Sequence, residues 1–325
     1  MIQQVTIENF KSIRQLSFAC SRVNVFVGEP GAGKSNLLEA LGMFSFAYFG
    51  GRGQLSDFVR LSGLSDLFYD RIVDHPLSIG CDDQRITLAF NSGAFQGLWS
   101  SGETRLADLY GNLGGPNLQV SGQVSGDFGF VRSYRFQPAG KLNRFESAFL
   151  MPPFGENLIS VLLAHADVYQ EAGRPFETIG LELNIRLPEL ELELQKRVKQ
   201  ASISYSYPYV LASDTFQRVV FFLAAIRTSQ NSTLVLEEPE AHAFPYYTTS
   251  LAEDIGLDAN QNQYFITTHN PYFLLPLVEK TPKDQLRVFV TYLKDYETKL
   301  RELTARELSR LDQSDLFWNL RKYAK

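Results

Sequence analysis

The sequence predicts an α/β protein with a mixed central sheet, an antiparallel β subdomain and a helical insertion. Near the N-terminus, an apolar strand runs into a glycine-rich loop and then into a helix. In the middle of the chain, short strands separated by Gly and Ser are followed by apolar residues at helical spacing. After residue 230, two more short apolar strands each end in polar side chains. These three observations carry the fold prediction.

The first 50 residues contain a predicted phosphate-binding loop. We expect strands over 5–10 and 18–27, and the second leads into the loop. The loop matches G-x-x-x-x-G-K-[ST], and a helix over 36–44 leaves it. The alternative, a glycine-rich turn with a chance Lys-Ser pair, is disfavoured by the flanking strand and helix. The residues expected at the nucleotide are Gly28, Glu29, Pro30, Gly31, Ala32, Gly33, Lys34, Ser35 and Asn36.

The residues of this loop have separate expected roles. Glycines let backbone N–H groups turn inward around a triphosphate. Lys34 is expected to reach the β- and γ-phosphates as a point charge, and the Ser35 hydroxyl to take one position on Mg²⁺. The stretch therefore predicts nucleotide binding with magnesium.

Three segments follow from the spacing of apolar residues and turn signals. We expect an N-terminal lobe over 1–140, an insertion over 141–204 and a C-terminal lobe over 205–325. Residues 77–136 are expected to form the antiparallel subdomain. The other expected elements are strands 85–90, 128–136, 181–185, 190–194, 234–236, 264–267, 287–293 and 299–303, and helices 158–169 and 213–226.

Two adjacent carboxylates end the predicted strand after residue 230. Glu237 and Glu238 follow an apolar run and precede Pro239. We assign Glu237 to Mg²⁺ and Glu238 to the general base that deprotonates the attacking water. The alternative is a pair of surface glutamates at a strand end, which is less favoured downstream of a phosphate-binding loop.

A histidine ends the next apolar strand. His269 follows residues 264–268 and precedes Asn270-Pro271. One interpretation is a switch that hydrogen-bonds the γ-phosphate or the attacking water and senses the nucleotide state. The other is a capping histidine before a turn. The order of the three motifs favours the switch.

The motif order resembles that of ABC-type P-loop NTPase heads, in the soluble branch that contains the OLD-like, RecF-like and SMC-like ATPases. Residues 7–13 are similar to the opening strand and turn of that branch, so Lys11 and Ser12 are expected near the nucleotide. Residues 237–242, with Pro245, resemble the Walker B extension of OLD-like proteins at slightly different spacing. The resemblance covers roughly residues 1–50 and 205–275. It implies an ATPase head with ATP and Mg²⁺ as cofactors.

The resemblance also implies two further contacts. A signature segment is expected before the Walker B strand, with Ser213 and Asp214 meeting the γ-phosphate held by the other subunit of a homodimer. Thr215 stands where the family commonly has Gly, and an ordinary helix start is the alternative. Gln137 is the candidate Q-loop residue for Mg²⁺, and an exposed turn glutamine is its alternative.

Composition limits the function classes. The chain has 325 residues, 44% hydrophobic content and a net charge of −5. This charge gives no indication of a generally basic nucleic-acid surface, although a local basic face is left open. Cys20 and Cys81 have no metal-type spacing and are read as reduced thiols of a cytoplasmic protein. The longest apolar run, 219–226, is too short to span a membrane.

We expect an ATPase that turns over slowly without a partner and uses its cycle to control a partner protein. Neither coiled-coil arms nor room for a Toprim nuclease is visible in the sequence. The family context suggests a separately encoded effector of bacterial anti-phage defence or a toxin–antitoxin-like system. The alternatives are a RecF-like DNA-repair or recombination clamp and a non-hydrolysing nucleotide-gated scaffold. The preference for ATP over GTP rests on the resemblance alone.

Overall fold

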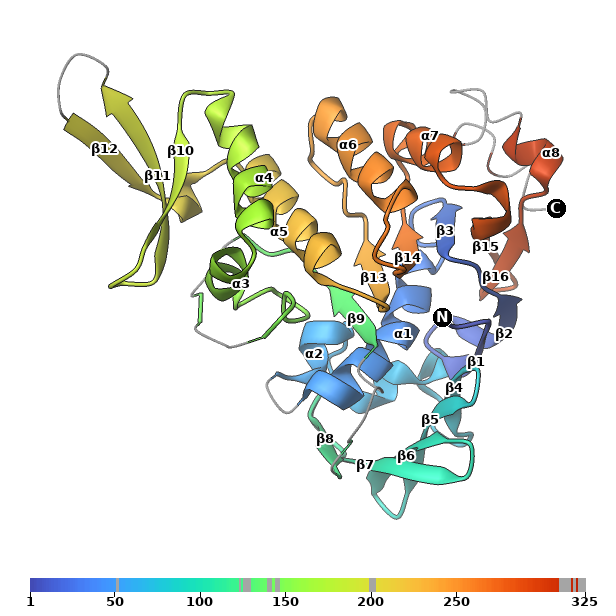
Figure 1. Cartoon of the computed structure of the whole chain (residues 1–325). Helices are drawn as coiled ribbons and strands as arrows, with labels where there is room; N and C mark the ends of the chain where they lie inside the picture. The colour runs from blue at the N-terminus through green and yellow to red at the C-terminus, as the bar shows by residue number, and fades with distance from the viewer. Residues whose placement is uncertain are drawn as a thin grey trace.

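The computed structural model describes residues 1–50, 53–122, 124, 130–138, 142–143, 147–198, 203–309, 317 and 320. In this part of the chain, strands form a six-stranded mixed sheet, a seven-stranded antiparallel sheet and a three-stranded antiparallel sheet (Figure 1). The predicted α/β class with a mixed central sheet and an antiparallel subdomain is therefore confirmed.

The six-stranded sheet is the centre of the fold. Its order is β16-β15-β3-β14-β13-β9, and every neighbouring pair is parallel except β15 with β16. A crossover connection brings each parallel neighbour back to the same starting edge. The strands are β3 (Val23–Gly28), β9 (Val131–Tyr134), β13 (Thr233–Glu237), β14 (Gln263–Thr267), β15 (Leu286–Lys294) and β16 (Glu297–Glu302).

The seven-stranded sheet lies below the central sheet in Figure 1 and runs in the order β2-β1-β4-β5-β6-β7-β8. Its strands are β1 (Gln4–Phe10), β2 (Ile13–Ala19), β4 (Leu77–Cys81), β5 (Gln84–Asn91), β6 (Ala94–Ser101), β7 (Thr104–Asn112) and β8 (Leu118–Ser121). The expected strand over 128–136 was wrongly placed in this subdomain. Residues 131–134 instead pair with β13 in the central sheet, and residues 125–129 lie outside the described residues.

The expected strand over 18–27 is divided between two sheets. Its first residues belong to β2, whereas residues 23–28 form β3. Asn24 explains the break, because its buried side chain accepts from the Ser21 N–H and donates to the Ser21 carbonyl, both at 2.8 Å. These bonds hold a turn where the prediction had continuous strand.

Helix α1 (Lys34–Phe49) lies between the two large sheets and is buried on nearly every side. It is apolar all round, as a helix covered on both sides must be. One core contains α1, the inner face of the antiparallel sheet and Phe26 of β3. The other core contains Val23, Val25 and Val27 of the same strand, packed toward α5 (Asp214–Thr228), α6 (Pro245–Gly256) and α7 (Pro271–Lys280). The run of apolar residues in β3 thus serves two cores at once.

The helical insertion consists of α3 (Leu158–Ala164) and α4 (Ala166–Glu177), which pack with α5. The expected single helix over 158–169 is broken at His165, whose φ of −122° and ψ of 89° are not helical. The three-stranded sheet projects from this lobe at the upper left of Figure 1. Its strands are β10 (Glu182–Arg186), β11 (Glu191–Val198) and β12 (Ile203–Pro208).

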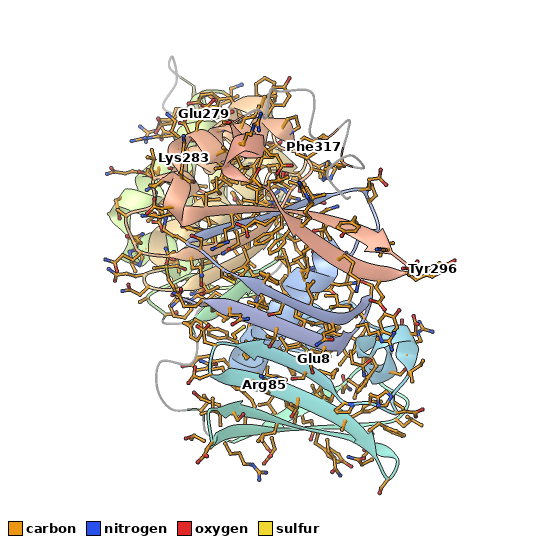
Figure 2. All side chains as sticks on the ribbon, turned by 90° about the vertical axis from the view of Figure 1, so that its right-hand side faces the viewer. Glu8, Arg85, Glu279, Lys283, Tyr296 and Phe317 are labelled. Atoms are coloured by element: carbon orange, nitrogen blue, oxygen red, sulfur yellow. The ribbon has the colours of Figure 1, made fainter. Side chains whose placement is uncertain are left out.

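The other described elements are short, apart from the hairpin that β15 and β16 form. This hairpin forms one edge of the central sheet, and Tyr296 lies at its tip (Figure 2). No helix among the described residues is long and apolar enough to cross a membrane. The short elements are α2 (Leu55–Phe58), η2 (Leu64–Leu67), η3 (Tyr69–Arg71), η4 (Tyr209–Leu211), η5 (Lys283–Gln285) and α8 (Ala305–Leu308).

Candidate nucleotide site

The glycine-rich loop joins the end of β3 to the start of α1. Gly31 and Gly33 have φ values of 79° and 91°, which L side chains rarely adopt. A Cβ on Gly28 would lie 2.3 Å from the Thr291 carbonyl oxygen, and one on Gly33 would lie 2.0 Å from Thr298 Oγ1. Glycine is therefore required at these positions, and the loop has the form of a phosphate cradle.

Lys34 lies in the mouth of this loop and is 8% exposed. Its Nζ donates to the carbonyl oxygens of Gly28, at 2.8 Å, and Glu29, at 3.0 Å. Burial lowers the pKa of the ammonium, and the nearby carboxylates of Glu238 and Glu237 raise it. Within the described residues, both acceptors of the ammonium are backbone carbonyl oxygens, so its charge is available to an anionic ligand.

A second layer of polar contacts holds the start of α1. Asn36 Nδ2 donates to Ser12 Oγ at 2.7 Å, and Ser12 Oγ lies 2.6 Å from Thr298 Oγ1. The Thr298 hydroxyl also reaches the Ala32 carbonyl oxygen at 3.3 Å. The structure thus places Ser12 and Asn36 beside the loop. Thr298, which the sequence analysis missed, lies there too because β16 passes the loop; no motif marks it.

Arg60 and Glu39 are two further residues that the motifs did not reveal. Arg60 Nη2 lies 3.0 Å from Glu237 Oε1, and Arg60 Nε lies 2.6 Å from Glu39 Oε1. Burial lowers the pKa of the guanidinium, but the two carboxylates outweigh it and the pKa is raised. Lys11 Nζ pairs with the same Glu39 and donates to the Arg60 carbonyl oxygen at 2.6 Å. Lys11 is thus engaged with this ion-pair network, on the Walker B side of α1.

Glu238 and His269 are in contact. The parallel register pairs Glu237 with Thr267, so the turns that follow β13 and β14 lie side by side. His269 Nδ1 is 3.1 Å from Glu238 Oε1. The Glu238 backbone N–H also reaches the Thr267 carbonyl, at 3.1 Å, and its hydroxyl, at 3.2 Å. The two residues with proposed catalytic and switch roles therefore lie in contact at the carboxyl edge of the sheet.

Glu240 lies beneath this pair and is 2% exposed. Burial raises the pKa of its carboxyl to about 7, although the hydrogen bond from Thr268 lowers it. The Thr268 hydroxyl donates to Glu240 Oε1 and accepts the Asn270 backbone N–H at 3.0 Å. Glu240 thus joins the Walker B turn to the turn that carries His269. Glu240 belongs to the acidic run at residues 237–240, and no motif assigns it a role.

The signature segment does not meet the loop within one chain. Ser213 caps α5 by accepting the Phe216 N–H at 3.3 Å, and the Thr215 hydroxyl donates to the His242 carbonyl oxygen at 3.0 Å. Ser213 and Asp214 are exposed. Among the described contacts, neither touches residues 28–36.

Ser35, Glu237 and Gln137 are the residues predicted to hold magnesium. Among the described residues, no group of three or more His, Cys, Asp or Glu side chains could hold a metal alone. Ser35 at the start of α1 and Glu237 at the end of β13 still fit Mg²⁺, which proteins bind through one or two side chains together with phosphate oxygens. Gln137 is exposed and lines a separate hollow of about 320 Å³ with Asp57 and Met151, whose lining does not include Glu237.

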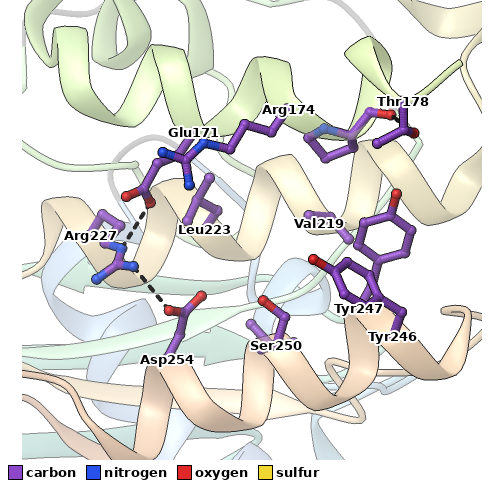
Figure 3. Close-up of a pocket in the computed structure, with 12 residues that line it drawn as sticks. Glu171, Arg174, Thr178, Val219, Leu223, Arg227, Tyr246, Tyr247, Ser250 and Asp254 are labelled. Carbon is purple, nitrogen blue, oxygen red and sulfur yellow. Dashed lines mark hydrogen bonds and ion pairs between the residues drawn. The ribbon is translucent and has the colours of Figure 1, made fainter.

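A further groove, of about 220 Å³, lies between α4, α5 and α6 (Figure 3). Arg227 crosses it, with Nε 3.2 Å from Glu171 Oε2 and Nη2 2.9 Å from Asp254 Oδ1. Burial raises the pKa of Asp254, and Arg227 lowers it. None of the nucleotide motif residues lines this groove. Its ion pairs tie the helical lobe to α6, which directly follows the Walker B turn.

Comparisons with protein families agree with this geometry. A family model described as an AAA ATPase domain matches residues 1–82. A second, described as AAA domain, putative AbiEii toxin, Type IV TA system, matches residues 162–275. No curated protein matches the chain.

Two solved structures show the same fold. The chain is similar to the Smc head bound to the C-winged helix domain of ScpA, with a TM-score of 0.55, 14% identity and coverage of 94% of this chain and 99% of that one. It is also similar to the Smc head domain with an extended coiled coil bound to the C-terminal domain of ScpA derived from Pyrococcus furiosus. There the TM-score is 0.51, the identity 13% and the coverage 95% of this chain and 98% of that one.

The comparisons agree on the fold and the broad class. The chain has the P-loop ATPase head fold of the two Smc head domains, and two separate stretches of it match AAA ATPase family models. The glycine-rich loop, Glu237, Glu238 and His269, which the sequence predicts as Walker A, Walker B and switch residues, follow parallel strands at one edge of the central sheet. The resemblance noted from the sequence is confirmed at this level, and the roles of single residues stay predictions.

Proposed function

We propose that this chain binds and hydrolyses ATP, dimerises around the nucleotide and uses the cycle to control a partner protein. One observation carries the proposal. The parallel register of β3, β14 and β13 brings the P-loop, His269 and Glu238 to one sheet edge, and Lys34 is close enough to Glu238 and Glu237 for its pKa to respond to them. A phosphate binder and a paired base beside it are the elements that phosphoryl transfer to water requires.

The chain's own residues divide the work. Lys34 and the loop N–H groups bind the β- and γ-phosphates. Glu238 accepts a proton from water as the water oxygen attacks the γ-phosphorus and the bond to the β-phosphate oxygen breaks. His269, whose Nδ1 lies 3.1 Å from Glu238 Oε1, orients that carboxylate. Magnesium, when bound, supplies positive charge to the phosphate oxygens, and Ser35 and Glu237 are the residues that would hold it.

Two observations support a homodimer. Ser213 and Asp214 are exposed and do not reach the loop of their own chain, so a second copy would complete the site. Large apolar side chains are also exposed on the elements beside that edge, and exposed apolar surface of this kind often marks an interface. These are Val210, Leu211, Phe244, Tyr246 and Tyr272, with exposures from 55% to 70%.

Control of a partner is supported by the comparisons. The second family model is described as a putative AbiEii toxin of a type IV toxin–antitoxin system, and both Smc heads are bound to a ScpA domain. We therefore propose a cytoplasmic head whose ATP cycle engages a separately encoded effector, in an anti-phage or toxin–antitoxin-like system.

Light scattering of Glu238→Gln, with and without MgATP, tests the proposal alongside phosphate release by the unmodified protein. We expect an ATP-dependent dimer of the variant and slow phosphate release by the unmodified protein. Lys34→Ala is the control and should give neither. A dimer without any phosphate release from the unmodified protein would favour the nucleotide-gated scaffold, and a protein that binds no nucleotide would overturn the proposal.

A further inference from the structure

The hairpin of β15 and β16 is the feature that the proposed function leaves unexplained. Tyr296 at its tip is 89% exposed, the highest value among the exposed large hydrophobic side chains of the described residues (Figure 2). We propose that the Tyr296 ring stacks on the base of a bound purine nucleotide. This inference rests on the proposed function and adds the base-binding part of the same site.

The direction of the nucleotide follows from the sheet order. β14 and β13 lie on one side of β3, and they carry His269 and Glu238 at their ends. β15 and β16 lie on the other side of β3. A triphosphate in the loop must turn its γ-phosphate toward the catalytic pair. Its ribose and base therefore leave the loop on the side of the hairpin.

The hairpin is fixed against the loop at its base. Thr291 of β15 pairs with Gly28, the last residue of β3. Thr298 of β16 is fully buried, lies 2.6 Å from Ser12 Oγ and reaches the Ala32 carbonyl. Thr291 and Thr298 thus flank the loop, and Tyr296 is two residues from Thr298. The tip is held at a defined place rather than swinging on a long linker.

The turn chemistry also indicates selection for the ring. Asp295 and Tyr296 have φ values of 53° and 63°. A two-residue hairpin turn with positive φ at both positions normally takes Asn-Gly or Asp-Gly. Tyrosine at the second position adds backbone strain and exposes an aromatic ring. Among the described residues, no ring contact or hydrogen bond of Tyr296 offsets this cost. A base stacked on the ring would offset it.

Stacking defines the class of ligand. An aromatic side chain recognises the face of a base without reading its hydrogen-bonding edge. The larger purine face gives more contact than a pyrimidine face. We therefore expect adenine and guanine nucleotides to gain similarly from Tyr296, and cytosine nucleotides to gain less.

Calorimetric titration of the full chain with magnesium separates base binding from phosphate binding. The probes are the non-hydrolysable β,γ-imido analogues of ATP, GTP and CTP, and inorganic tripolyphosphate, which has no base. We expect Tyr296→Ala to weaken the ATP analogue about 10-fold to 100-fold and to leave tripolyphosphate unchanged. Tyr296→Phe should retain the affinity because it keeps the ring.

Tyr110→Ala is the matched control, because Tyr110 is an exposed tyrosine of β7, in the antiparallel sheet. It should bind every probe as the unmodified protein does. An unchanged affinity of Tyr296→Ala for the ATP analogue would overturn the inference. Equal losses for the analogue and tripolyphosphate would also overturn it, since they would place the defect in the loop. If the unmodified protein bound tripolyphosphate but showed no Tyr296 effect, the proposed function would survive and only the base contact would fail.

Discussion

The two sides of strand β3 differ in their chemistry. On the side of β14 and β13, charged groups meet: His269 contacts Glu238, and Arg60 joins Glu237 to Glu39. On the side of β15 and β16, neutral groups meet: the hydroxyls of Ser12 and Thr298 bond to each other beside the loop. Both sides flank the same loop. The charged pairs of β15 and β16, such as Arg287 with Glu302, are separate from the hydroxyl contacts that meet the loop.

This difference separates chemistry from positioning. Charged neighbours on one side respond to a phosphate group or to a change of pH, because each ion pair competes with the ligand for its partner. The neutral hydroxyls of Ser12 and Thr298 on the other side have no charged partner for which a phosphate would compete. We expect the groups on the charged side to respond to the nucleotide and those on the neutral side to keep the loop in place. Four substitutions, in the loop and on the charged side, test this expectation.

Glu238→Gln should have the largest effect. The amide cannot accept a proton from water, so kcat should fall by about 100-fold to 10,000-fold while nucleotide affinity changes little. Phosphate release and calorimetry measure the two quantities. Glu8→Gln, at an exposed position of β1, is the control and should retain both. If Glu238→Gln retained its turnover, Glu238 would not be the general base.

Lys34→Ala should weaken nucleotide binding by about 100-fold, because it removes a charged hydrogen-bond donor from the loop mouth. Titration with the β,γ-imido analogue of ATP measures the loss. Lys196→Ala, at an exposed position of β11, should leave the affinity unchanged. A similar loss in both variants would mean that general charge, rather than the loop, attracts the ligand.

Glu240→Gln should change the pH dependence of stability. The carboxyl has a pKa of about 7 in the folded chain and an ordinary value of 4.5. Its native proton therefore contributes stability that is complete below pH 4.5 and is lost as the pH rises through 7. Gln carries no such proton. Relative to the unmodified protein, the free energy of unfolding of the variant should therefore rise by on the order of 2–3 kcal/mol between pH 5 and pH 8. Urea unfolding at each pH measures the gap, and a gap that stays constant would contradict a buried, titrating Glu240.

Arg60→Ala should have the smallest effect. It leaves the buried Glu39 with Lys11 as its remaining ion-pair partner and frees Glu237. Because Arg60 is half exposed, solvent screens the loss, and we expect about 1 kcal/mol in the free energy of unfolding. Arg71→Ala breaks the more exposed pair with Asp66 and should cost less. If urea unfolding gave the two variants the same loss of free energy of unfolding, the Arg60 network would be no more stabilising than an ordinary surface ion pair.

The sequence predicts the parts of the site that contiguous residues encode. The loop at residues 28–35, the two carboxylates after β13 and the histidine after β14 are each readable because one strand and its next turn contain the whole signal. The contact between Glu238 and His269 comes from the structure, in which β13 and β14 are parallel neighbours that end at the same edge.

The remaining parts depend on pairing between distant segments. Thr298 reaches Ser12 only because β16 passes the loop, and Arg60 reaches Glu237 only because α2 packs beside α1. The division of residues 18–27 depends on one buried amide, Asn24, which hydrophobic patterning does not weigh. The burial of Glu240 was likewise invisible, since a third glutamate in an acidic run reads as solvent-exposed.

The position of β3 in the sheet has a consequence for folding during synthesis. Val23 begins the strand that carries the P-loop, yet its partners in the sheet are Tyr264 and Leu286. During synthesis, the first hairpin of β1 and β2 finds its partners at once, whereas β3 waits for most of the chain to emerge. The nascent P-loop strand therefore carries open hydrogen-bonding edges and apolar faces for most of translation. A growing chain of this kind depends on its C-terminal strands, rather than on nucleotide, to close the sheet and escape aggregation.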